Sequence, residues 1–330
     1  MKICFAKQSG SDVFYELVNG ETKAWLETHD WMLDIPAPSD DVREFLKGYD
    51  GIITTWGSPC MDQAVLDANP DLKIIGHAAG SVADYIAPEV FAAGIKVTTA
   101  NNLMAGAVAD WCLTMTLIGL RRFLDYASFS GKTDLKWNMN GRAKSIQSAT
   151  IGIWGFGTIA SHYIELLKPL NPAKILVNSN HLSEVDAASH GMAKTEFNEL
   201  FAKSDVILLL SSLTPKTAGM VGQEQLALIK DDAVLINCGR GKLVDEAALY
   251  AELGKGRFTG ILDVFHQEPL PETSPLLTMP NVILTPHNAG RPSRGCYVPF
   301  ILDEFKRFFN GHPLEGEVSR ERACTMTSQK

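Results

Sequence analysis

Three ionisable side chains in the second half of the chain have the types that proton transfer and carboxylate binding require. Arg240, Glu268 and His287 each stand shortly after an apolar run. An imidazole titrates near neutral pH and can give a proton to a developing alkoxide. A neighbouring carboxylate would orient the ring and favour its charged form. A guanidinium can clamp a carboxylate through two parallel hydrogen bonds.

Each of the three also has a simpler explanation. Arg240 fits a surface cation, Glu268 a solvated loop carboxylate, and His287 a histidine satisfied after a turn proline. Most ionisable residues are not catalytic. All three, however, follow predicted strands of one sheet, and ligands of parallel sheets gather at the carboxyl ends of the strands. The combination therefore favours a functional role.

A glycine-rich turn precedes these residues along the chain. Residues 150–160 carry G-x-G-x-x-A between a hydrophobic strand and a helix. Gly155 allows the tight turn, Gly157 lets the backbone approach a pyrophosphate, and Ala160 allows close packing of helix on strand. The helix that follows presents free N–H groups and a positive dipole end to phosphates. Glycines also occur in ordinary turns, but the strand and helix on either side predict dinucleotide binding.

The end of the next predicted strand bears on the choice of dinucleotide. Asn178 stands where an NAD site usually has Asp or Glu to accept from the ribose hydroxyls. An amide can still bond a ribose and does not repel a 2′-phosphate, and no Arg lies nearby in the sequence to attract one. NAD is the expected cofactor, and NADP stays open.

The elements that must position these residues follow the βαβ pattern of a parallel α/β fold. With 330 residues, two domains are expected. We predict two Rossmann-like, doubly wound parallel sheets, the second a complete dinucleotide-binding sheet of six strands. The predicted strands are 2–6, 51–55, 73–76 and 95–99, then 150–154, 174–178, 205–211, 233–238, 259–264 and 281–284; the predicted helices include 41–46, 61–69 and 292–310.

One apolar segment separates the two blocks. Residues 103–120 are about long enough to span a bilayer, but Asp110 lies near the middle. Because a carboxylate inside a membrane is costly, we favour a helix buried between domains or subunits. The polar stretch 128–148 that follows has weak periodicity and is predicted to be a long loop or arm.

Composition excludes several classes of function. A formal net charge of −8 argues against a nucleic-acid surface. The six cysteines include no C-x-x-C pair and the histidines no metal-spaced pair, so no metal is expected. Free thiols and a start without a signal-peptide pattern suit a cytoplasmic protein.

The chain resembles the D-isomer-specific 2-hydroxyacid dehydrogenase family over essentially its whole length. The resemblance rests on Asn237-x-x-Arg240-Gly241-x-x-Val244-Asp245, Asp263-Val264-Phe265-x-x-Glu268-Pro269 and Thr285-Pro286-His287. It implies an NAD(P)-dependent enzyme that moves a hydride to or from C2 of a small D-2-hydroxy or 2-oxo acid. His287 would be the general acid/base, Glu268 its partner and Arg240 the anchor of the substrate carboxylate.

The resemblance also implies binding residues. Asp263 would hold the nicotinamide carboxamide, and backbone groups of Ala79, Gly80 and Ser81 would bind the substrate's carboxylate. Trp56 follows a strand of the first block and fits either the substrate pocket or plain packing. The expected cofactor contacts are Gly155, Phe156, Gly157, Thr158, Ile159, Asn178, Ser179, Ser211, Ser212, Thr217, Cys238, Gly239, Arg240, Asp263 and His287.

The family implies a split first domain and a dimer. Residues 1–102 and 291–330 would form the substrate-binding domain and 103–290 the dinucleotide-binding domain, with a deep cleft between them. The helix and arm of 103–149 would form a homodimer.

Some positions depart from the family. Ser211-Ser212 stands where His-x-Pro is common, and Arg291 follows the His287 loop where Thr or Ser is usual. Arg291 would add a positive charge to the cleft or face solvent, and we favour solvent. Cys238 ends an apolar strand, so a small core thiol fits it better than a nucleophile.

A function of another class stays open. Corepressors of the same fold use NAD binding to control assembly and can retain all three ionisable residues, so the chain could be a dinucleotide-sensing binding protein. The lack of obvious partner-binding extensions favours the enzyme.

Overall fold

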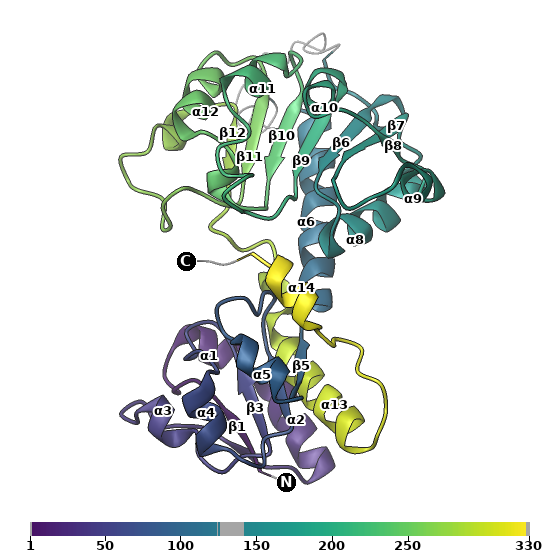
Figure 1. Cartoon of the computed structure of the whole chain (residues 1–330). Helices are drawn as coiled ribbons and strands as arrows, with labels where there is room; N and C mark the ends of the chain where they lie inside the picture. Colours follow the sequence, from purple (N-terminus) through teal and green to yellow (C-terminus); the bar gives the residue numbers. More distant parts are fainter. Residues whose placement is uncertain (1, 124, 126–141, 328–330) are drawn as a thin grey trace. The chain divides into compact units, whose positions relative to one another are not determined.

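The computed structural model describes residues 2–123, 125 and 142–327. The chain divides into two compact units, which we describe separately (Figure 1). The first unit comprises Met1–Ala105 with Arg291–Lys330, and the second comprises Gly106–Gly290. Of the arm expected at 128–148, residues 128–141 lie outside the described part of the chain.

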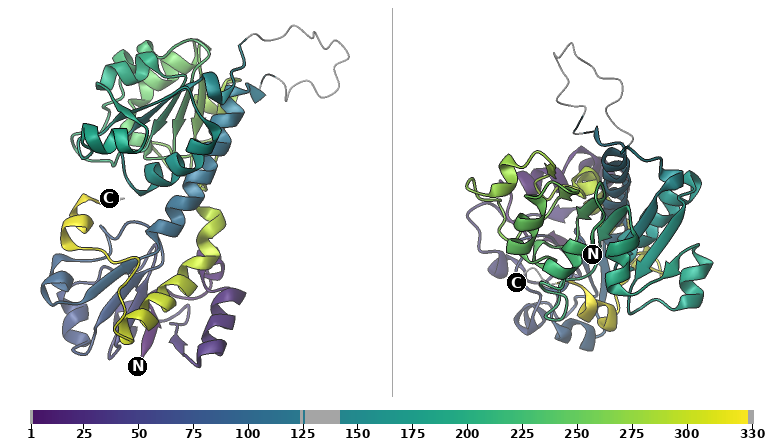
Figure 2. Two further views of the ribbon diagram at one scale, coloured as in Figure 1. Left: turned by 90° about the vertical axis from the view of Figure 1, so that its right-hand side faces the viewer. Right: turned by 90° about the horizontal axis from the view of Figure 1, so that it is seen from above.

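The first unit is built on a five-stranded parallel sheet in the order β2-β1-β3-β4-β5. Successive residues of β3 alternate between its faces: Ile52 packs with Val65 of α4, and Ile53 packs with Phe305 of α13. Helices therefore cover both faces, as Figure 2 shows. The strands are β1 (Ile3–Phe5), β2 (Leu33–Asp34), β3 (Gly51–Thr54), β4 (Ile74–His77) and β5 (Lys96–Thr99); the helices are α1 (Asp12–Leu17), α2 (Gly20–His29), α3 (Val42–Phe45), α4 (Gln63–Ala68), α5 (Pro88–Ala92), α13 (Tyr297–Phe309) and α14 (Arg320–Thr325).

The second unit contains a seven-stranded sheet in the order β12-β11-β10-β9-β6-β7-β8, with every pairing parallel. The carboxyl ends of all its strands therefore lie along one edge. The strands are β6 (Thr150–Trp154), β7 (Lys174–Asn178), β8 (Ala193–Lys194), β9 (Val206–Leu209), β10 (Val234–Asn237), β11 (Thr259–Leu262) and β12 (Val282–Leu284); the helices are α8 (Thr158–Leu167), α9 (Glu184–Ser189), α10 (Phe197–Lys203), α11 (Gln223–Leu228) and α12 (Glu246–Leu253).

The structure confirms two doubly wound parallel sheets and corrects three details. The second sheet has seven strands, not six, because the two-residue strand β8 has no apolar run to announce it. The first sheet likewise gains β2. The helix predicted at 292–310 begins later: Arg291–Cys296 forms 3₁₀ turns across Pro292 and Gly295, and the α-helix α13 starts at Tyr297.

The long apolar helix α6 (Asn101–Leu120) buries one stripe of small side chains. Within the second unit, Cys112 meets Cys238 after β10, and the Thr116 hydroxyl lies 2.8 Å from the Tyr163 hydroxyl of α8. Asp110 faces away from this stripe and is exposed. Among the described residues, α6 is the one helix long and apolar enough to cross a membrane by length and composition alone.

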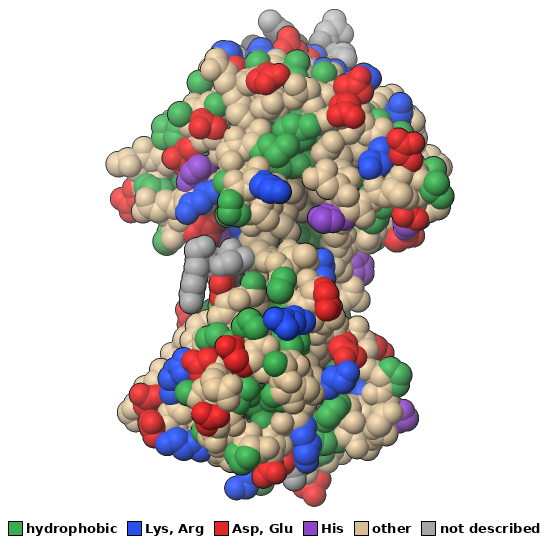
Figure 3. Space-filling view, viewed as in Figure 1, with side chains coloured by type: hydrophobic (Ala, Val, Ile, Leu, Met, Phe, Trp, Pro, Cys, Tyr) green, Lys and Arg blue, Asp and Glu red, His purple; other side chains and the backbone are tan. Residues whose placement is uncertain are grey.

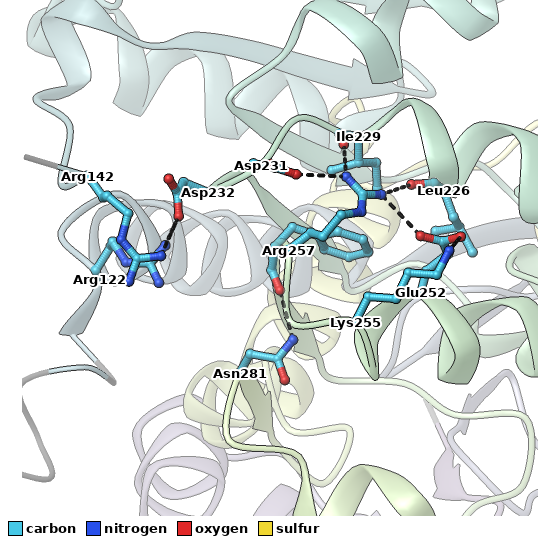
Figure 4. A network of polar contacts seen from close by, with 11 residues as sticks. Arg122, Arg142, Leu226, Ile229, Asp231, Asp232, Glu252, Lys255, Arg257 and Asn281 are labelled. Atoms are coloured by element: carbon cyan, nitrogen blue, oxygen red, sulfur yellow. Dashed lines mark hydrogen bonds and ion pairs between the residues drawn. The ribbon is translucent and has the colours of Figure 1, made fainter.

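A polar network closes the edge of the second sheet opposite the strands' carboxyl ends (Figure 4). Arg257, just before β11, donates to Glu252 of α12 at 3.1 Å and to Asp231 at 3.1 Å. Glu252 is almost fully buried, yet hydrogen bonds from Lys255 and Arg257 outweigh burial and hold the pKa of this carboxyl below its usual range. The buried charge is thus fully paired, as burial of an ion requires.

The surface carries no large field of one sign on the face that Figure 3 shows. Lysine, arginine, aspartate and glutamate side chains are interspersed over each unit there. This mixture agrees with the modest negative net charge.

Gly76 of β4 is a position where the packing can be tested. A Cβ there would lie 2.2 Å from Ile301 and 2.9 Å from Phe305, both on α13. We expect Gly76→Ala to destabilise the protein by about 1–3 kcal/mol, because overpacking must displace the helix. Gly20→Ala, whose Cβ would meet nothing within 4 Å, is the control. Equal thermal midpoints for the two variants would contradict the packing described.

Candidate active site

The imidazole of His287 and the carboxylate of Glu268 lie in direct contact. His287 follows β12 and Glu268 follows β11, and these strands are neighbours in the sheet. His287 Nδ1 lies 2.6 Å from Glu268 Oε2, and the other oxygen, Oε1, accepts from the Phe265 N–H at 3.0 Å. Both side chains remain about two-fifths exposed. The pair predicted from the sequence is therefore present, with Nε2 of the ring left for a ligand.

Charge around Glu268 keeps this carboxyl ionised. Burial raises the pKa of Glu268, but the hydrogen bonds from His287 and the Phe265 N–H, with the charges of His287 and Arg240, outweigh it. The net pKa lies below the usual range for a glutamate. Because the folded-state pKa of Glu268 is lowered, its ionisation stabilises the fold fully above the unfolded-state pKa of a glutamate, and this stabilisation is lost as the pH falls through the folded-state pKa.

Asp263, just after β11, holds the loop that carries His287. Its Oδ1 accepts from the Thr285 hydroxyl at 2.5 Å and from the Asn288 N–H at 2.9 Å, and Oδ2 accepts from the Ala289 N–H at 3.1 Å. His287 itself has φ +48°, a left-handed conformation that is uncommon for a side-chain-bearing residue. The buried carboxylate therefore fixes an otherwise unfavourable turn.

Arg240 is positioned by backbone contacts after β10. The Asn237 side chain accepts from the Gly239 N–H at 3.2 Å and donates to the Arg240 carbonyl at 3.1 Å. A Cβ at Gly241 would lie 2.1 Å from the carbonyl of Phe265, so only glycine lets this turn lie against the segment that leads to Glu268. The guanidinium is close enough for its charge to act on Glu268. Arg240, Glu268 and His287 thus gather at the carboxyl edge of one sheet.

The glycine turn after β6 has the shape that a pyrophosphate requires. Gly155 has φ +95°, and a Cβ there would lie 2.6 Å from the Ser211 backbone. Gly157 is different, because a Cβ there would meet no atom within 4 Å. Ala160, in the first turn of α8, is fully buried, and this helix has no side-chain cap at its N-terminus. Open space before an uncapped helix N-terminus fits a phosphate.

The other expected cofactor contacts lie along the same edge. Asn178 gives one amide N–H to the Thr195 carbonyl at 2.9 Å, and its Oδ1 stays available for a ribose hydroxyl. Ser179 accepts from the His181 N–H at 3.4 Å. After β9, Ser211 abuts the glycine turn, and the Thr217 hydroxyl donates to the Ser212 carbonyl at 2.7 Å. These residues, with Phe156, Thr158, Ile159 and Gly239, fit a dinucleotide laid across the carboxyl ends of the strands.

Cys238 lies beneath the arginine turn as a core thiol. Its Sγ is 3.1 Å from Sγ of Cys112 on α6, and both side chains are buried. Burial and this contact raise the pKa of Cys112, so that thiol keeps its proton. The prediction that Cys238 is a small core thiol is confirmed.

Apart from Arg240, the expected substrate residues belong to the first unit. Trp56 follows β3, is partly buried, and has the Arg294 guanidinium 5.0 Å from its ring centre. After β4, the Ala79 N–H is already donated to the His77 carbonyl at 2.8 Å. Within the part of the chain that the structure describes, the N–H groups of Gly80 and Ser81 have no such acceptor.

Two further side chains shape this edge. His77 is fully buried, and burial lowers its pKa to about 3, so the ring is neutral and structural; its Nδ1 contacts the Thr54 hydroxyl at 2.9 Å. Arg291, which was expected to face solvent, is exposed, and it forms an ion pair with Glu16. The sequence had no local signal for either contact, because both partners come from distant segments.

Comparison with known proteins matches residues 113–289 to the family model described as D-isomer specific 2-hydroxyacid dehydrogenase, NAD binding domain. A glyoxylate reductase of Korarchaeum cryptofilum is 31% identical over 297 residues, 88% of this chain and 89% of that protein. A human glyoxylate reductase/hydroxypyruvate reductase is 29% identical over 301 residues, 88% of this chain and 90% of that protein. The solved D-lactate dehydrogenase of Lactobacillus jensenii with NAD⁺ has a TM-score of 0.77 at 24% identity, covering 97% of this chain and all of that one.

The two glycines of the turn should separate folding from cofactor binding. We expect Gly157→Ala to keep the wild-type thermal midpoint and to weaken NADH binding about tenfold or more, because its methyl group occupies space that only a ligand would use. Gly155→Ala should lose stability as well, because its Cβ meets backbone at a positive φ. Calorimetric titration with NADH and a thermal scan measure both. Unchanged NADH affinity in Gly157→Ala would contradict the placement of the pyrophosphate.

Proposed function

This chain belongs to the D-isomer-specific 2-hydroxyacid dehydrogenase family and is an NAD(P)-dependent oxidoreductase of 2-hydroxy acids; on that premise we propose that it reduces small 2-oxo acids with His287 as the acid. The observation that carries the proposal is the contact of 2.6 Å between His287 and Glu268 at the edge where the glycine turn lies. Relatives named as glyoxylate and hydroxypyruvate reductases support a short acid.

The side chains divide the work by their chemistry. The nicotinamide, when bound, supplies or accepts the hydride at C2 of the substrate. Arg240 binds the substrate's carboxylate and orients the carbonyl. Because Nδ1 of His287 is held by Glu268, Nε2 gives the proton to the carbonyl oxygen and takes it back in the reverse direction. Glu268 stays ionised and stabilises the imidazolium.

The cofactor fits the residues present. The open space at Gly157 and the uncapped start of α8 suit the pyrophosphate, and Asn178 suits the adenosine ribose. An amide there neither repels nor attracts a 2′-phosphate, so both NADH and NADPH belong in the test. Substrate-dependent loss of reduced cofactor with glyoxylate, hydroxypyruvate, pyruvate, phenylpyruvate and bulkier 2-oxo acids tests the function directly.

The enzyme is favoured over the NAD-sensing binding protein. A binding protein needs no acid beside the nicotinamide, whereas His287 is held in a turn that costs conformational energy. The relatives described above are named as reductases and dehydrogenases. Cofactor binding without turnover of any 2-oxo acid would favour the binding protein instead.

We also propose a cytoplasmic homodimer. The cysteines are free thiols, which suit a reducing compartment. The face of α6 that the second unit leaves uncovered includes Leu117, which is 37% exposed, and an apolar exposed helix face suits a partner subunit. Light scattering after size-exclusion chromatography tests the dimer.

Removing the imidazole should separate chemistry from binding. We expect His287→Ala to lower kcat by about 10²–10⁴-fold, the usual contribution of general acid catalysis, with NADH affinity nearly unchanged. Steady-state kinetics and a direct NADH titration measure the two effects. Turnover equal to that of the wild type would remove His287 from the mechanism.

Neutralising the partner should change the pH dependence. In Glu268→Gln no carboxylate stabilises the protonated ring, so we expect the alkaline limb of kcat/KM for reduction to move to lower pH, with turnover lowered less than in His287→Ala. The acid limb should lose any step that reflects the lowered pKa of Glu268. Profiles of kcat/KM against pH for both proteins measure this. A profile that coincides with the wild type would show that Glu268 does not act through the ring.

A further inference from the structure

Lys7 lies at the carboxyl end of the first unit's sheet, where the chain leaves β1. The preceding residue, Ala6, still donates its N–H to the Ile53 carbonyl of β3 at 2.7 Å, so Lys7 emerges beside the end of β3. That end continues into Trp56 and Gly57. Ligands of open parallel sheets collect at this edge. The ammonium is therefore placed among the residues expected to meet substrate.

The ammonium of Lys7 has no counter-charge in the described part of the chain. No hydrogen bond or ion pair involves its Nζ there, although the side chain is partly buried. Burial, with no opposing carboxylate, lowers the pKa of Lys7. Other lysines that are partly covered do have partners: Lys144 and Lys230 both bind Asp205, at 2.6 and 2.7 Å.

The turn beside Lys7 is shaped to admit it. A Cβ at Gly57 would lie 2.8 Å from Lys7 Nζ, and Gly57 has φ +80°. The Ser58 hydroxyl accepts from the Thr55 N–H at 2.9 Å and closes the turn, and the Gly57 N–H donates to the Tyr85 hydroxyl at 3.4 Å. The turn is thereby held in one conformation, with the ammonium against its glycine.

The same turn is tied to the loop expected to bind substrate. The Thr55 hydroxyl donates to the Ala78 carbonyl at 3.2 Å. The Thr99 hydroxyl contacts the carbonyls of Ala79 and Gly80 at 2.8 and 2.7 Å. Lys7 thus lies against the turn of residues 55–58, and a hydrogen bond connects that turn to the loop after β4 within the first unit.

The carboxylate of Glu16 does not offset the charge of Lys7, because it is already paired with two arginines. Arg291 and Arg294 share one carboxylate, Glu16, and together they hold its pKa below the usual range. Arg294 also lies 5.0 Å over the Trp56 ring. Two guanidinium groups on one carboxylate leave an excess positive charge, and Lys7 adds another.

We propose that Lys7 binds a second anionic group of the substrate, so that the enzyme selects 2-oxo acids that carry a carboxylate or a phosphate at the end away from the reacting carbonyl. The proposal rests on the proposed function, because it concerns the substrate of that same reaction. A half-buried ammonium without a partner is costly to the fold, and an anionic ligand is the group that would offset the cost.

The test compares Lys7→Met with wild type on two sets of 2-oxo acids. One set carries a second anion: oxaloacetate and 2-oxoglutarate with a carboxylate, and 3-phosphohydroxypyruvate with a phosphate. The other ends in a neutral group: pyruvate, 2-oxobutyrate and hydroxypyruvate. Methionine keeps an unbranched apolar side chain of nearly the same length and removes the ammonium with its charge and its three hydrogen-bond donors. Lys73→Met is the matched control, because Lys73 lies before β4 at the opposite edge and is exposed beside Asp50.

We expect the wild type to prefer at least one acid with a second anion. Lys7→Met should lower kcat/KM for that acid by about 10–100-fold, the worth of one charge-assisted hydrogen bond, mainly through KM. The neutral set should change less than about twofold, and Lys73→Met should change neither. Lys7→Arg should recover part of the loss. If kcat/KM falls more for the acids with a second carboxylate, the second anion is a carboxylate; if it falls more for 3-phosphohydroxypyruvate, the second anion is a phosphate.

Three outcomes would overturn the proposal. One is an equal effect of Lys7→Met on both sets, and another is no effect on either. The third is a preference of the wild type for the neutral set, which would overturn the role of Lys7 but leave the proposed function intact. If no 2-oxo acid is turned over, the proposed function fails by itself; calorimetric binding of 2-oxoglutarate to wild type and Lys7→Met in the presence of NAD⁺ then decides on Lys7. A thermal midpoint no lower in Lys7→Met confirms that the variant is folded.

Discussion

The placement of His287 depends on the buried carboxylate of Asp263. A carboxylate at 2% exposure needs hydrogen-bond donors, and here three donors of the 285–289 segment reach it. Those bonds hold His287 at a positive φ that its own side chain disfavours. The ring then meets Glu268 through Nδ1, and this contact decides which nitrogen is left for chemistry.

Parallel strands make the site possible from distant segments. Asp263, Glu268 and His287 follow two neighbouring strands, β11 and β12, while Arg240 follows β10 on the other side of β11. The glycine turn after β6 shares the same edge. Since all strands of this sheet are parallel, the loops that follow them lie along the same edge. The opposite edge of the sheet carries ion pairs such as that of Arg257 with Glu252.

The sequence predicted the strands that bury continuous apolar runs and failed on the short ones. β6 and β7 have the predicted bounds, whereas β2 and β8 are two residues long and are set by their neighbours. The contact between His287 and Glu268 was predictable, because both residues follow adjacent strands of a parallel sheet. The bonds from the 285–289 segment to Asp263 were not, because they depend on a loop conformation that no residue pattern specifies.

The residues that break local rules are the informative ones in this chain. Glu252 and Asp205 are buried carboxylates, and each is paired with two cationic side chains. These ion pairs stabilise the fold. Gly155 and His287 occupy positive φ, and Lys7 carries a covered charge without a counter-ion in the described chain. The left-handed conformation of His287 and the covered charge of Lys7 each cost free energy, so a fold selected for stability alone would remove them. Gly155 and His287 lie at the carboxyl edge of one sheet and Lys7 at the carboxyl edge of the other, where ligands of parallel sheets bind. A bound dinucleotide and a doubly anionic acid would satisfy what the protein itself leaves unsatisfied.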